Sequence, residues 1–299
     1  MPSLLGYQVA SRCPVADDAR SPANGCAATT CDTSCESAFC PGHNPCIGIT
    51  NALNMKSLIT SGLVILALIF QVTEASAQKK KILVDVAHGQ KFYSDPADKI
   101  STELVPADRL TYMTGELTKN GAAHNAEINY LKTPITTDAL SKCDLLFIHT
   151  ASTKYSANEC KAIRQYIEKG GSLFIVMEED YWATLAQVNV NDIVTPLGIT
   201  FANDNPDKST GGHSKPGKIT KNKYLIPSHG ARIVEGGTPF AYSDKSDANP
   251  IGVFKEIKGG GKVIAMGEGM VSLYMTSWQE VSGYQCSGFM EDVIGWLLE

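Results

Sequence analysis

The sequence lacks several features that would assign a function directly. It has no excess of basic residues, since 26 Lys and Arg stand against 31 Asp and Glu, for a net charge of −5. No apolar run reaches the ~20 residues that a transmembrane helix needs. The chain also contains no internal repeat, no H-x-x-x-H pair and no C-x-x-C spacing. We therefore expect no nucleic-acid partner, no stable membrane span and none of the common metal-binding motifs.

The longest apolar run, Leu58 to Phe70, lies in a segment with the layout of a secretory signal peptide. Met55 and Lys56 form a short basic start before it, and Ala75-Ser76-Ala77 forms an A-x-A cleavage site after it. An uncleaved anchor fits less well, because no stop-transfer charges follow the run. Residues 55–77 are therefore predicted to be removed after directing the chain to the periplasm or out of the cell.

Six of the nine cysteines precede this segment, in a stretch with almost no hydrophobic periodicity. A disulfide knot and a zinc module are the structured alternatives, but no spacing among these cysteines selects either one. We expect residues 1–54 to be a disordered or mis-assigned leader, with the true start at Met55.

Residues 78–299 have the length of one domain with a full hydrophobic core. Three cysteines remain there, and an odd number leaves at least one thiol free in an oxidising compartment. Cys143 and Cys160 stand where apolar residues are expected, so we interpret them as buried structural thiols. Cys286 lies just before a predicted helix and is the one candidate for a reactive thiol.

The first part of this domain alternates between strand and helix patterns. The segments predicted to be strands are Ile82–Asp85, Asn125–Leu131, Asp144–His149 and Ser172–Met177. The helix before the last of them has the clearest signature, a capping box formed by Ser156 and Glu159 with Gly170-Gly171 at its end. This spacing predicts βαβ units and therefore a mostly parallel sheet.

The second part is less regular. From residue 202 to residue 249 the sequence is rich in Gly, Pro, Asn, Asp and Ser, and we interpret it as a loop-rich insertion that folds near the sheet edge as a lid. Regular structure returns with a predicted hairpin of Gly252–Ile257 and Lys262–Met266, and the chain closes with a helix that carries Phe289, Val293 and Trp296 on one face.

Several segments together resemble a known superfamily. They are the strand that ends at His88-Gly89, DLLFIHT, the S-x-x-E helix, GGSLFIV, GEGMVS and the final FMEDVIGWLL helix. They are similar to exported members of the class I glutamine amidotransferase-like superfamily, in the branch related to the GIFT domain and to ThuA-like proteins. The resemblance covers Lys81 to Leu298 outside the insertion. It implies an α/β, flavodoxin-like three-layer sandwich with a mostly parallel sheet.

The chain departs from this superfamily at the nucleophile. Where the amidotransferases carry a Gly-x-Cys-x-Gly elbow, this sequence reads Met177-Glu178-Glu179-Asp180. The elbow chemistry needs a thiol or hydroxyl exposed on a strained turn. We therefore expect no glutaminase activity.

The carboxyl ends of the predicted strands bring polar side chains to one edge of the sheet, where folds of this kind bind ligands. Candidate catalytic residues there are His88, Glu178, Glu179 and Glu268. Candidate ligand-binding residues are Asp85, His88, Gly89, Gln90, His149, Asp180, Trp182 and Tyr284. Asp85 would hold His88 in one tautomer, the absent side chain of Gly89 would admit a ligand, and the aromatic rings would stack on sugar faces.

Each of these residues also has a structural interpretation. His88 is equally well explained as a turn histidine bonded to backbone, and the acidic run from Glu178 to Asp180 as charge at the amino end of a following helix. Histidine and carboxylate together suit Zn or Mn, but the ligand spacing is absent, so we expect no metal or other cofactor.

Three functions remain open at this point. The leading one is an exported, non-amidase domain that binds a small polar or carbohydrate ligand at the carboxyl edge of the sheet. The second is a carbohydrate-active hydrolase that uses His88 with Glu178, Glu179 or Glu268. The third is a protein-interaction module in an envelope complex.

Overall fold

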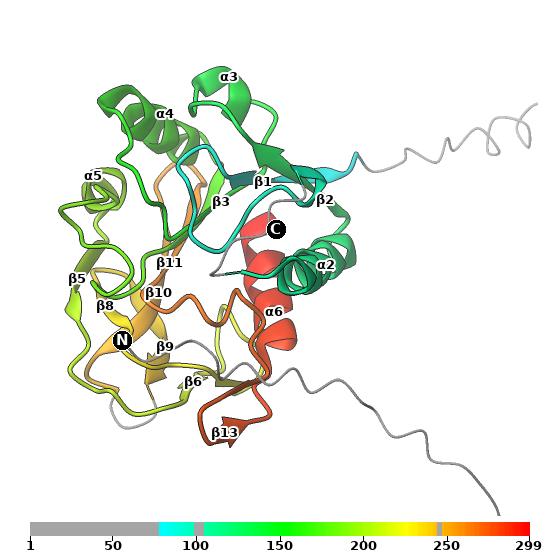
Figure 1. The fold of residues 1–299 in the computed structure, drawn as a ribbon. Coiled ribbons are helices and arrows are strands. Elements are labelled where there is room, and N and C mark those ends of the chain that lie inside the picture. The colour runs from blue at the N-terminus through cyan, green and yellow to red at the C-terminus, as the bar shows by residue number, and fades with distance from the viewer. Residues whose placement is uncertain (1–77, 99–104, 244–246) are drawn as a thin grey trace, which may run out of the picture. The chain divides into compact units, whose positions relative to one another are not determined.

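The computed structural model describes residues 78–98, 105–243 and 247–299 (Figure 1). The predicted leader, residues 1–54, and the predicted signal peptide, residues 55–77, lie outside these ranges. Nothing in the described part is a helix long and apolar enough to cross a membrane.

The fold is mixed α/β, built on a nine-stranded sheet with the order β2-β1-β3-β4-β11-β10-β9-β6-β7. Five strands are parallel to one another: β1 (Lys80–Asp85), β2 (Ala126–Leu131), β3 (Leu145–His149), β4 (Ser172–Val176) and β11 (Lys262–Met266). Four antiparallel strands extend it: β10 (Pro250–Glu256), β9 (Thr238–Ser243), β6 (Gly212–Ser214) and β7 (Leu225–Ile226). Two small sheets pair β5 (Thr200–Asp204) with β8 (Arg232–Glu235) and β12 (Ser277–Trp278) with β13 (Val281–Ser282).

Helices cover both faces of the parallel strands (Figure 1). One face carries α2 (Ala107–Ala123) and α6 (Cys286–Leu298), which we call the α6 face. The other carries α4 (Ala157–Glu168) and α5 (Asn191–Val194), which we call the α4 face, with α3 (Thr137–Leu140) beside α4. The remaining short elements are the 3-10 turns η1 (Pro96–Asp98) and η2 (Thr195–Leu197). The finer flavodoxin-like assignment stays a prediction.

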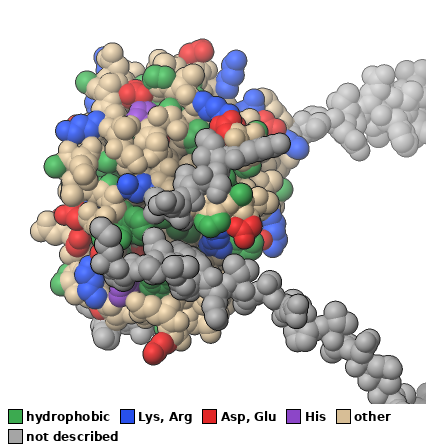
Figure 2. Space-filling model, in the orientation of Figure 1, with side chains coloured by type: hydrophobic (Ala, Val, Ile, Leu, Met, Phe, Trp, Pro, Cys, Tyr) green, Lys and Arg blue, Asp and Glu red, His purple; other side chains and the backbone are tan. Residues whose placement is uncertain are grey.

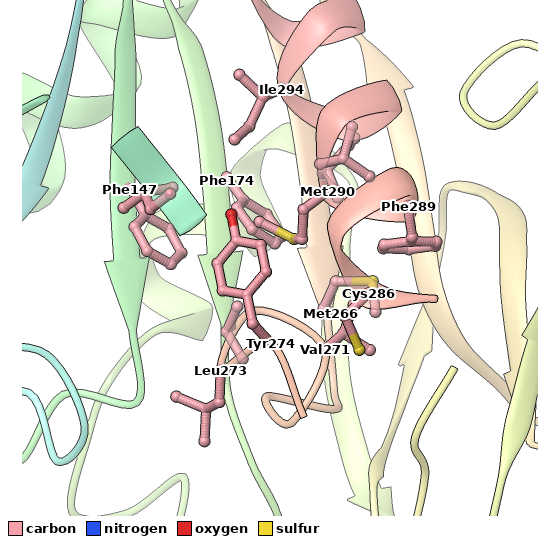
Figure 3. Close-up of a cluster of buried hydrophobic side chains, with 14 of the residues drawn as sticks. Phe147, Phe174, Met266, Val271, Leu273, Tyr274, Cys286, Phe289, Met290 and Ile294 are labelled. Carbon is pink, nitrogen blue, oxygen red and sulfur yellow. The ribbon is translucent and has the colours of Figure 1, made fainter. Parts of the chain in front are cut away.

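The alternation of side chains along each strand divides the core between these faces. In β3, Phe147 packs on the α6 face, whereas Leu146 and Ile148 pack on the α4 face. Figure 3 shows the α6 side, where Phe147 and Phe174 meet Met290 and Ile294 of α6. The face on which a strand-end residue lies therefore follows from its register.

The predicted capping box is confirmed. The Ser156 hydroxyl accepts a hydrogen bond from the backbone N–H of Glu159, and the Glu159 carboxylate accepts one from the backbone N–H of Ser156. The predicted hairpin is also present, because β10 and β11 pair antiparallel.

The segment from 202 to 249 is more regular than the sequence indicates. Its strands β6, β7 and β9 continue the main sheet, and its β8 pairs with β5. The segment thus lies at the edge of the sheet. It adds strands to the sheet and does not fold over it as the predicted lid. No helix starts at Glu178 to Asp180, since the chain there turns back through a hydrogen bond from the Trp182 N–H to the Glu179 carbonyl. The helix-capping interpretation of this acidic run is therefore wrong.

On the surface drawn in Figure 2, acidic and basic side chains are interspersed, with no region where one sign gathers.

Candidate functional site

Polar residues follow four adjacent parallel strands at the carboxyl edge of the sheet. Asp85 ends β1, His149 ends β3, and Glu178 and Glu268 stand two residues beyond the ends of β4 and β11. His149 pairs in register with Val176, and Val176 pairs with Met266, so Glu178 and Glu268 stand at equivalent positions. Because residues two apart share a face, both glutamates lie on the α6 face, whereas Asp85 follows Val84 and lies on the α4 face. The edge therefore holds two separate polar clusters.

The first, the His88 cluster, consists of Asp85, His88, Tyr155 and Glu159. His88 donates from Nδ1 to the Asp85 carboxylate at 2.9 Å and from Nε2 to Glu159 Oε1 at 3.1 Å. Its ring stacks on Tyr155 at 4.0 Å between centroids, and the Tyr155 hydroxyl donates to Asp85 at 2.9 Å. All four side chains are buried, and each has polar partners within the cluster.

These contacts fix the charge of His88. Ionised carboxylates only accept hydrogen bonds, so both ring nitrogens must carry protons. Burial alone would lower the pKa of His88, but the hydrogen bonds and charges of Asp85 and Glu159 outweigh it and raise the pKa above 6.5. The pKa of Glu159 is lowered, because hydrogen bonds from Ser156 and Ile135 and the charge of His88 overcome its own burial. The cluster is a closed ionic network between β1 and α4.

Gly89 has a conformational role beside this network. Its φ of +60° is in the left-handed region, which lets the chain turn after His88. The nearest atom to an added Cβ would be Ser152 Cβ at 3.6 Å, an ordinary contact. The left-handed turn accounts for glycine at this position, and the predicted role of Gly89 in admitting a ligand is not needed to explain it.

The second, the Glu178–Glu268 cluster, is organised differently. Glu178 is 4% exposed and Glu268 is 1% exposed. Glu178 accepts a hydrogen bond from the Gly269 N–H at 2.6 Å, and Glu268 accepts from the N–H groups of Met270 at 2.8 Å and His229 at 3.0 Å. Within the described residues, neither carboxylate forms an ion pair with a lysine or arginine. Backbone amides are the partners of two buried acids.

Burial favours the protonated form of both acids, and at Glu178 it outweighs the opposing charge of Arg232. Burial raises the pKa of Glu178 from 4.5 to about 7. Burial, and then the charge of Glu178, raises the pKa of Glu268 well above its ordinary value. Shifts of this kind are typical of functional sites, although ionic networks also produce them.

Buried polar atoms near this edge lack hydrogen-bond partners in the described chain. They are both amide atoms of Gln90, His149 Nδ1, Thr150 Oγ1, His229 Nδ1 and the Tyr284 hydroxyl. The pKa of Tyr284 is raised to about 12 by burial and then by the charge of Glu268. Such unpaired atoms are uncommon in folded proteins and mark the carboxyl edge of the sheet as a candidate binding region.

His149 lies between the two clusters and is completely buried among aromatic rings. Phe92, Tyr93 and Phe147 surround it, with ring centroids 5.6, 5.2 and 5.9 Å away. Burial lowers the pKa of His149 to about 4, so the imidazole is neutral at pH 7. A Cβ at Gly269 would lie 2.6 Å from Glu178 Oε1 and 3.0 Å from His149 Nε2. Glycine at position 269 is therefore what lets the β11 loop approach both residues.

The other predicted residues have structural partners. Asp180 forms a 2.7 Å ion pair with Arg232, which is 1% exposed and also donates to the carbonyls of Glu178 and Ala202. Glu179 pairs with Lys208 at 2.9 Å and is 19% exposed. Trp182 packs edge-on against Phe92 at 5.0 Å between centroids.

The structure thus brings Glu178, Glu268 and Tyr284 together but places His88 on the opposite face from the two glutamates. Sequence reasoning missed Tyr155, Glu159 and Arg232 as members of these networks. The capping box already located Glu159, but no local pattern showed that its carboxylate reaches His88. A buried arginine in an alternating strand carries no signal at all.

Cys286 is the first residue of α6 and is buried, and its thiol donates to the Met275 carbonyl at 3.1 Å. Burial raises the pKa of this thiol far above its ordinary value, which disfavours the reactive thiolate. Within the described ranges, no three His, Cys, Asp or Glu side chains are grouped closely enough to hold a metal ion. A cavity of about 630 Å³ lies at the amino edge, lined by Lys80, Asp144, Ser172 and Lys262 among others, away from both clusters.

Comparisons with known proteins give a partial assignment. Residues 113–210, which run from α2 through β5, match the family model of the IFT52 GIFT domain. The structure is similar to the mmIFT52 N-terminal domain, with 18% identity, a TM-score of 0.52 and coverage of 73% of this chain and 97% of that chain. This likeness supports a shared fold alone.

Two glycosidases align more weakly and bear on neither fold nor function. The exo-β-1,4-mannosidase Op5Man5 from Opitutaceae bacterium strain TAV5 has 12% identity, a TM-score of 0.41 and coverage of 73% of this chain and 35% of that chain. The β-galactosidase from Bacillus circulans sp. alkalophilus has 10% identity, a TM-score of 0.42 and coverage of 72% and 30%. No curated protein matches the chain.

Proposed function

We propose that this chain is a non-amidase domain that binds a small polar, carbohydrate-related ligand at the Glu178–Glu268 cluster. The observation that carries the proposal is a pair of buried acids and a buried tyrosine hydroxyl. Among the described residues, the acids accept hydrogen bonds from backbone amides alone and the hydroxyl has no partner. A polar ligand would satisfy these groups, because hydroxyl and amine groups supply the donors and acceptors that the protein leaves unmatched.

The strand order supports the location of the site. The parallel strands run β2-β1-β3-β4-β11, which follows the 2-1-3-4-5 order of flavodoxin-like sheets. In such sheets ligands bind outside the carboxyl ends of the strands. The glutamine amidotransferase-like kinship belongs to the same proposal, with Glu178 following the strand that carries the nucleophile in that superfamily.

Thermal-shift measurements on the full chain test this function. A panel of mono- and oligosaccharides should contain members that raise the Tm through mass action. Tyr284→Phe, which removes only the unpaired hydroxyl, should weaken the response. Tyr112→Phe is the matched control, since Tyr112 lies on α2 and is 41% exposed. A panel without any shift would contradict the proposal.

A hydrolase is the second candidate, favoured by one observation. Two adjacent carboxyls, of which one stays protonated near neutral pH, resemble the acid and base of glycoside hydrolysis. His88 would take no part, because both of its ring nitrogens are engaged with carboxylates on the α4 face. Release of nitrophenol from a panel of nitrophenyl glycosides, lost in Glu268→Gln, separates an enzyme from a binding domain.

A protein-interaction module is the third candidate and rests on the likeness to the mmIFT52 N-terminal domain. Large hydrophobic side chains exposed on the described surface are Tyr112 on α2, Tyr181 in the turn after β4 and Leu225 on β7. Scattered single residues of this kind do not form the contiguous apolar patch of an interface. We therefore rank this candidate below ligand binding.

Export to the periplasm or the medium belongs to the proposal as well, because Met55 to Ala77 has the layout of a signal peptide. Amino-terminal sequencing of the secreted protein should begin at Gln78.

A further inference from the structure

The acid pair has a geometry that selects the charge of its ligand. The β4–β11 register ends at the pair Val176 and Met266, and Glu178 and Glu268 each stand two residues beyond it, in the loops that follow these neighbouring strands. Neighbouring strands are ~4.8 Å apart, so the two carboxyls start from adjacent backbone positions. Both are more than nine-tenths buried and accept hydrogen bonds from N–H groups of Gly269, Met270 and His229.

Tyr284 is an independent sign of a ligand at the same place. It is 7% exposed, and its hydroxyl has no hydrogen-bond partner among the described residues. The hydroxyl lies 4.0 Å from where a Cβ at Gly211 would stand, and the Gly211 N–H donates to the carbonyl of Ser228, the residue before the His229 that donates to Glu268. A buried hydroxyl is normally paired. Because this one has no partner in the described chain, its oxygen is available to a ligand that also contacts the two acids.

The chemistry of these three groups favours an organic cation. Together they offer oxygens from two carboxyls and one phenol, and a primary ammonium has three N–H donors to place on them. A divalent metal usually takes four or more ligands, whereas the described residues provide no group of three acidic, histidine or cysteine side chains around one point. An ammonium ion would also favour ionisation of the two buried acids, which a neutral hydroxyl does not do.

We infer that the ligand of this site carries a protonated primary amine, which binds between the carboxyls of Glu178 and Glu268 and the hydroxyl of Tyr284. The inference rests on the proposed function and narrows its ligand to polar molecules with an ammonium group, such as amino sugars. Glu179, one residue beyond Glu178, is partly exposed and marks where the same loop reaches solvent.

Binding of an ammonium ion should release protons from the pair. The cation favours the ionised carboxylates, so affinity should rise as pH increases through the pKa of about 7 of Glu178. Other titratable or charged groups near the pair also contribute to this dependence: Glu179 on the same loop, Arg232 on β8, His149 on β3, His229 before β8 and Tyr284 before α6.

Isothermal titration calorimetry with glucamine and sorbitol tests the inference, because glucamine differs from sorbitol only in having a primary amine in place of one terminal hydroxyl. For the full chain at pH 8 we expect glucamine to bind about tenfold or more tightly than sorbitol, as for a hydrogen-bonded charge. At pH 5 the preference for glucamine over sorbitol should shrink, because the acids are protonated. At pH 8 the heat of glucamine binding should vary with the ionisation enthalpy of the buffer, because binding releases protons.

Substitutions test whether the preference for glucamine over sorbitol comes from the Glu178–Glu268 cluster. Glu178→Gln keeps the shape of the side chain and should reduce the preference for glucamine to about threefold or less. Glu127→Gln, which makes the same charge change on the exposed edge of β2, should leave it intact.

The outcomes separate the two proposals. Equal affinities for glucamine and sorbitol, or binding of neutral sugars without binding of glucamine, overturn the inference and leave the proposed function standing. No binding of either polyol together with no thermal shift from the sugar panel overturns both. A preference for glucamine that survives in Glu178→Gln also overturns the inference, since the amine would then bind elsewhere.

Discussion

The two polar clusters at the carboxyl edge use the same residue types with opposite results. In the His88 cluster, two carboxylates flank one imidazolium, and hydrogen bonds of 2.9 to 3.1 Å join them. In the Glu178–Glu268 cluster, the two carboxyls accept hydrogen bonds from the consecutive backbone amides of Gly269 and Met270, and Glu268 also accepts from the His229 amide. Burial is nearly equal in the two, so burial alone does not distinguish a structural network from a candidate site.

The difference lies in which state of each cluster the fold favours. Removing a charge from the His88 cluster leaves another charge buried without its partner, which is costly. Removing a charge from the Glu178–Glu268 cluster relieves repulsion and desolvation. Substitutions that neutralise an acid should therefore destabilise the first cluster and stabilise the second.

Asp85→Ala should have the largest effect. Asp85 accepts hydrogen bonds from His88, Tyr155 and the Ala87 N–H, and the alanine would leave a buried imidazolium with one carboxylate. We expect the free energy of unfolding to fall by about 4 kcal/mol, as when one partner of a buried ion pair is removed. Urea denaturation at pH 6 measures this, and Asp85→Asn should recover part of the loss. A change below about 1 kcal/mol would mean that the network is not structural.

The pH dependence of Glu178 should give the next largest effect. Its folded pKa of about 7 exceeds the unfolded value of 4.5, so the folded state holds its proton more tightly. The stability that this proton contributes is complete below pH 4.5 and is lost as pH rises to about 7. The expected loss is about 3 kcal/mol. Urea denaturation from pH 4.5 to pH 7.5 measures it in the ligand-free protein.

Glu178→Gln isolates this contribution, because glutamine keeps the shape and cannot ionise. The variant should equal the wild type near pH 4.5 and be more stable at pH 7.5. Glu127→Gln controls for the loss of one surface charge. If Glu178→Gln is destabilising at pH 7.5, the glutamate is ionised and paired in the folded state, and the contrast between the clusters disappears.

Much of the fold follows from local patterns in the sequence. The unalternating run Leu145–His149 predicts a strand buried on both faces, and the Ser156 and Glu159 capping box fixes the start of α4. Strands such as β6 and β9 were not predicted, because Gly212–Ser214 and Thr238–Ser243 gain their strand pairing from distant segments. Propensity carries little information about pairing of that kind.

The sequence predicts which residues lie at the carboxyl edge of the sheet but not which of them lie together. The sequence predicts that Asp85, His88, Glu178 and Glu268 follow strand ends at the carboxyl edge, and the structure has them there, since parallel strands end together. The sequence did not show that Asp85 and His88 meet α4 while the two glutamates lie on the α6 face. That division depends on the register between β3, β4 and β11, which a single sequence does not encode locally.

Deleting one hydroxyl from each cluster makes the smallest but most closely matched comparison. Tyr155 and Tyr284 are 2% and 7% exposed. Within the part of the chain that the structure describes, the Tyr155 hydroxyl donates to the Asp85 carboxylate and the Tyr284 hydroxyl has no partner. Tyr155→Phe should lower the free energy of unfolding by about 2 kcal/mol, the worth of a hydrogen bond to an ionised group. Tyr284→Phe should change it by less than about 0.5 kcal/mol, because no hydrogen bond is lost. Parallel urea titrations measure both. Equal losses would show that the Tyr284 hydroxyl is held by the protein itself, and the site would then lose its independent sign of a ligand.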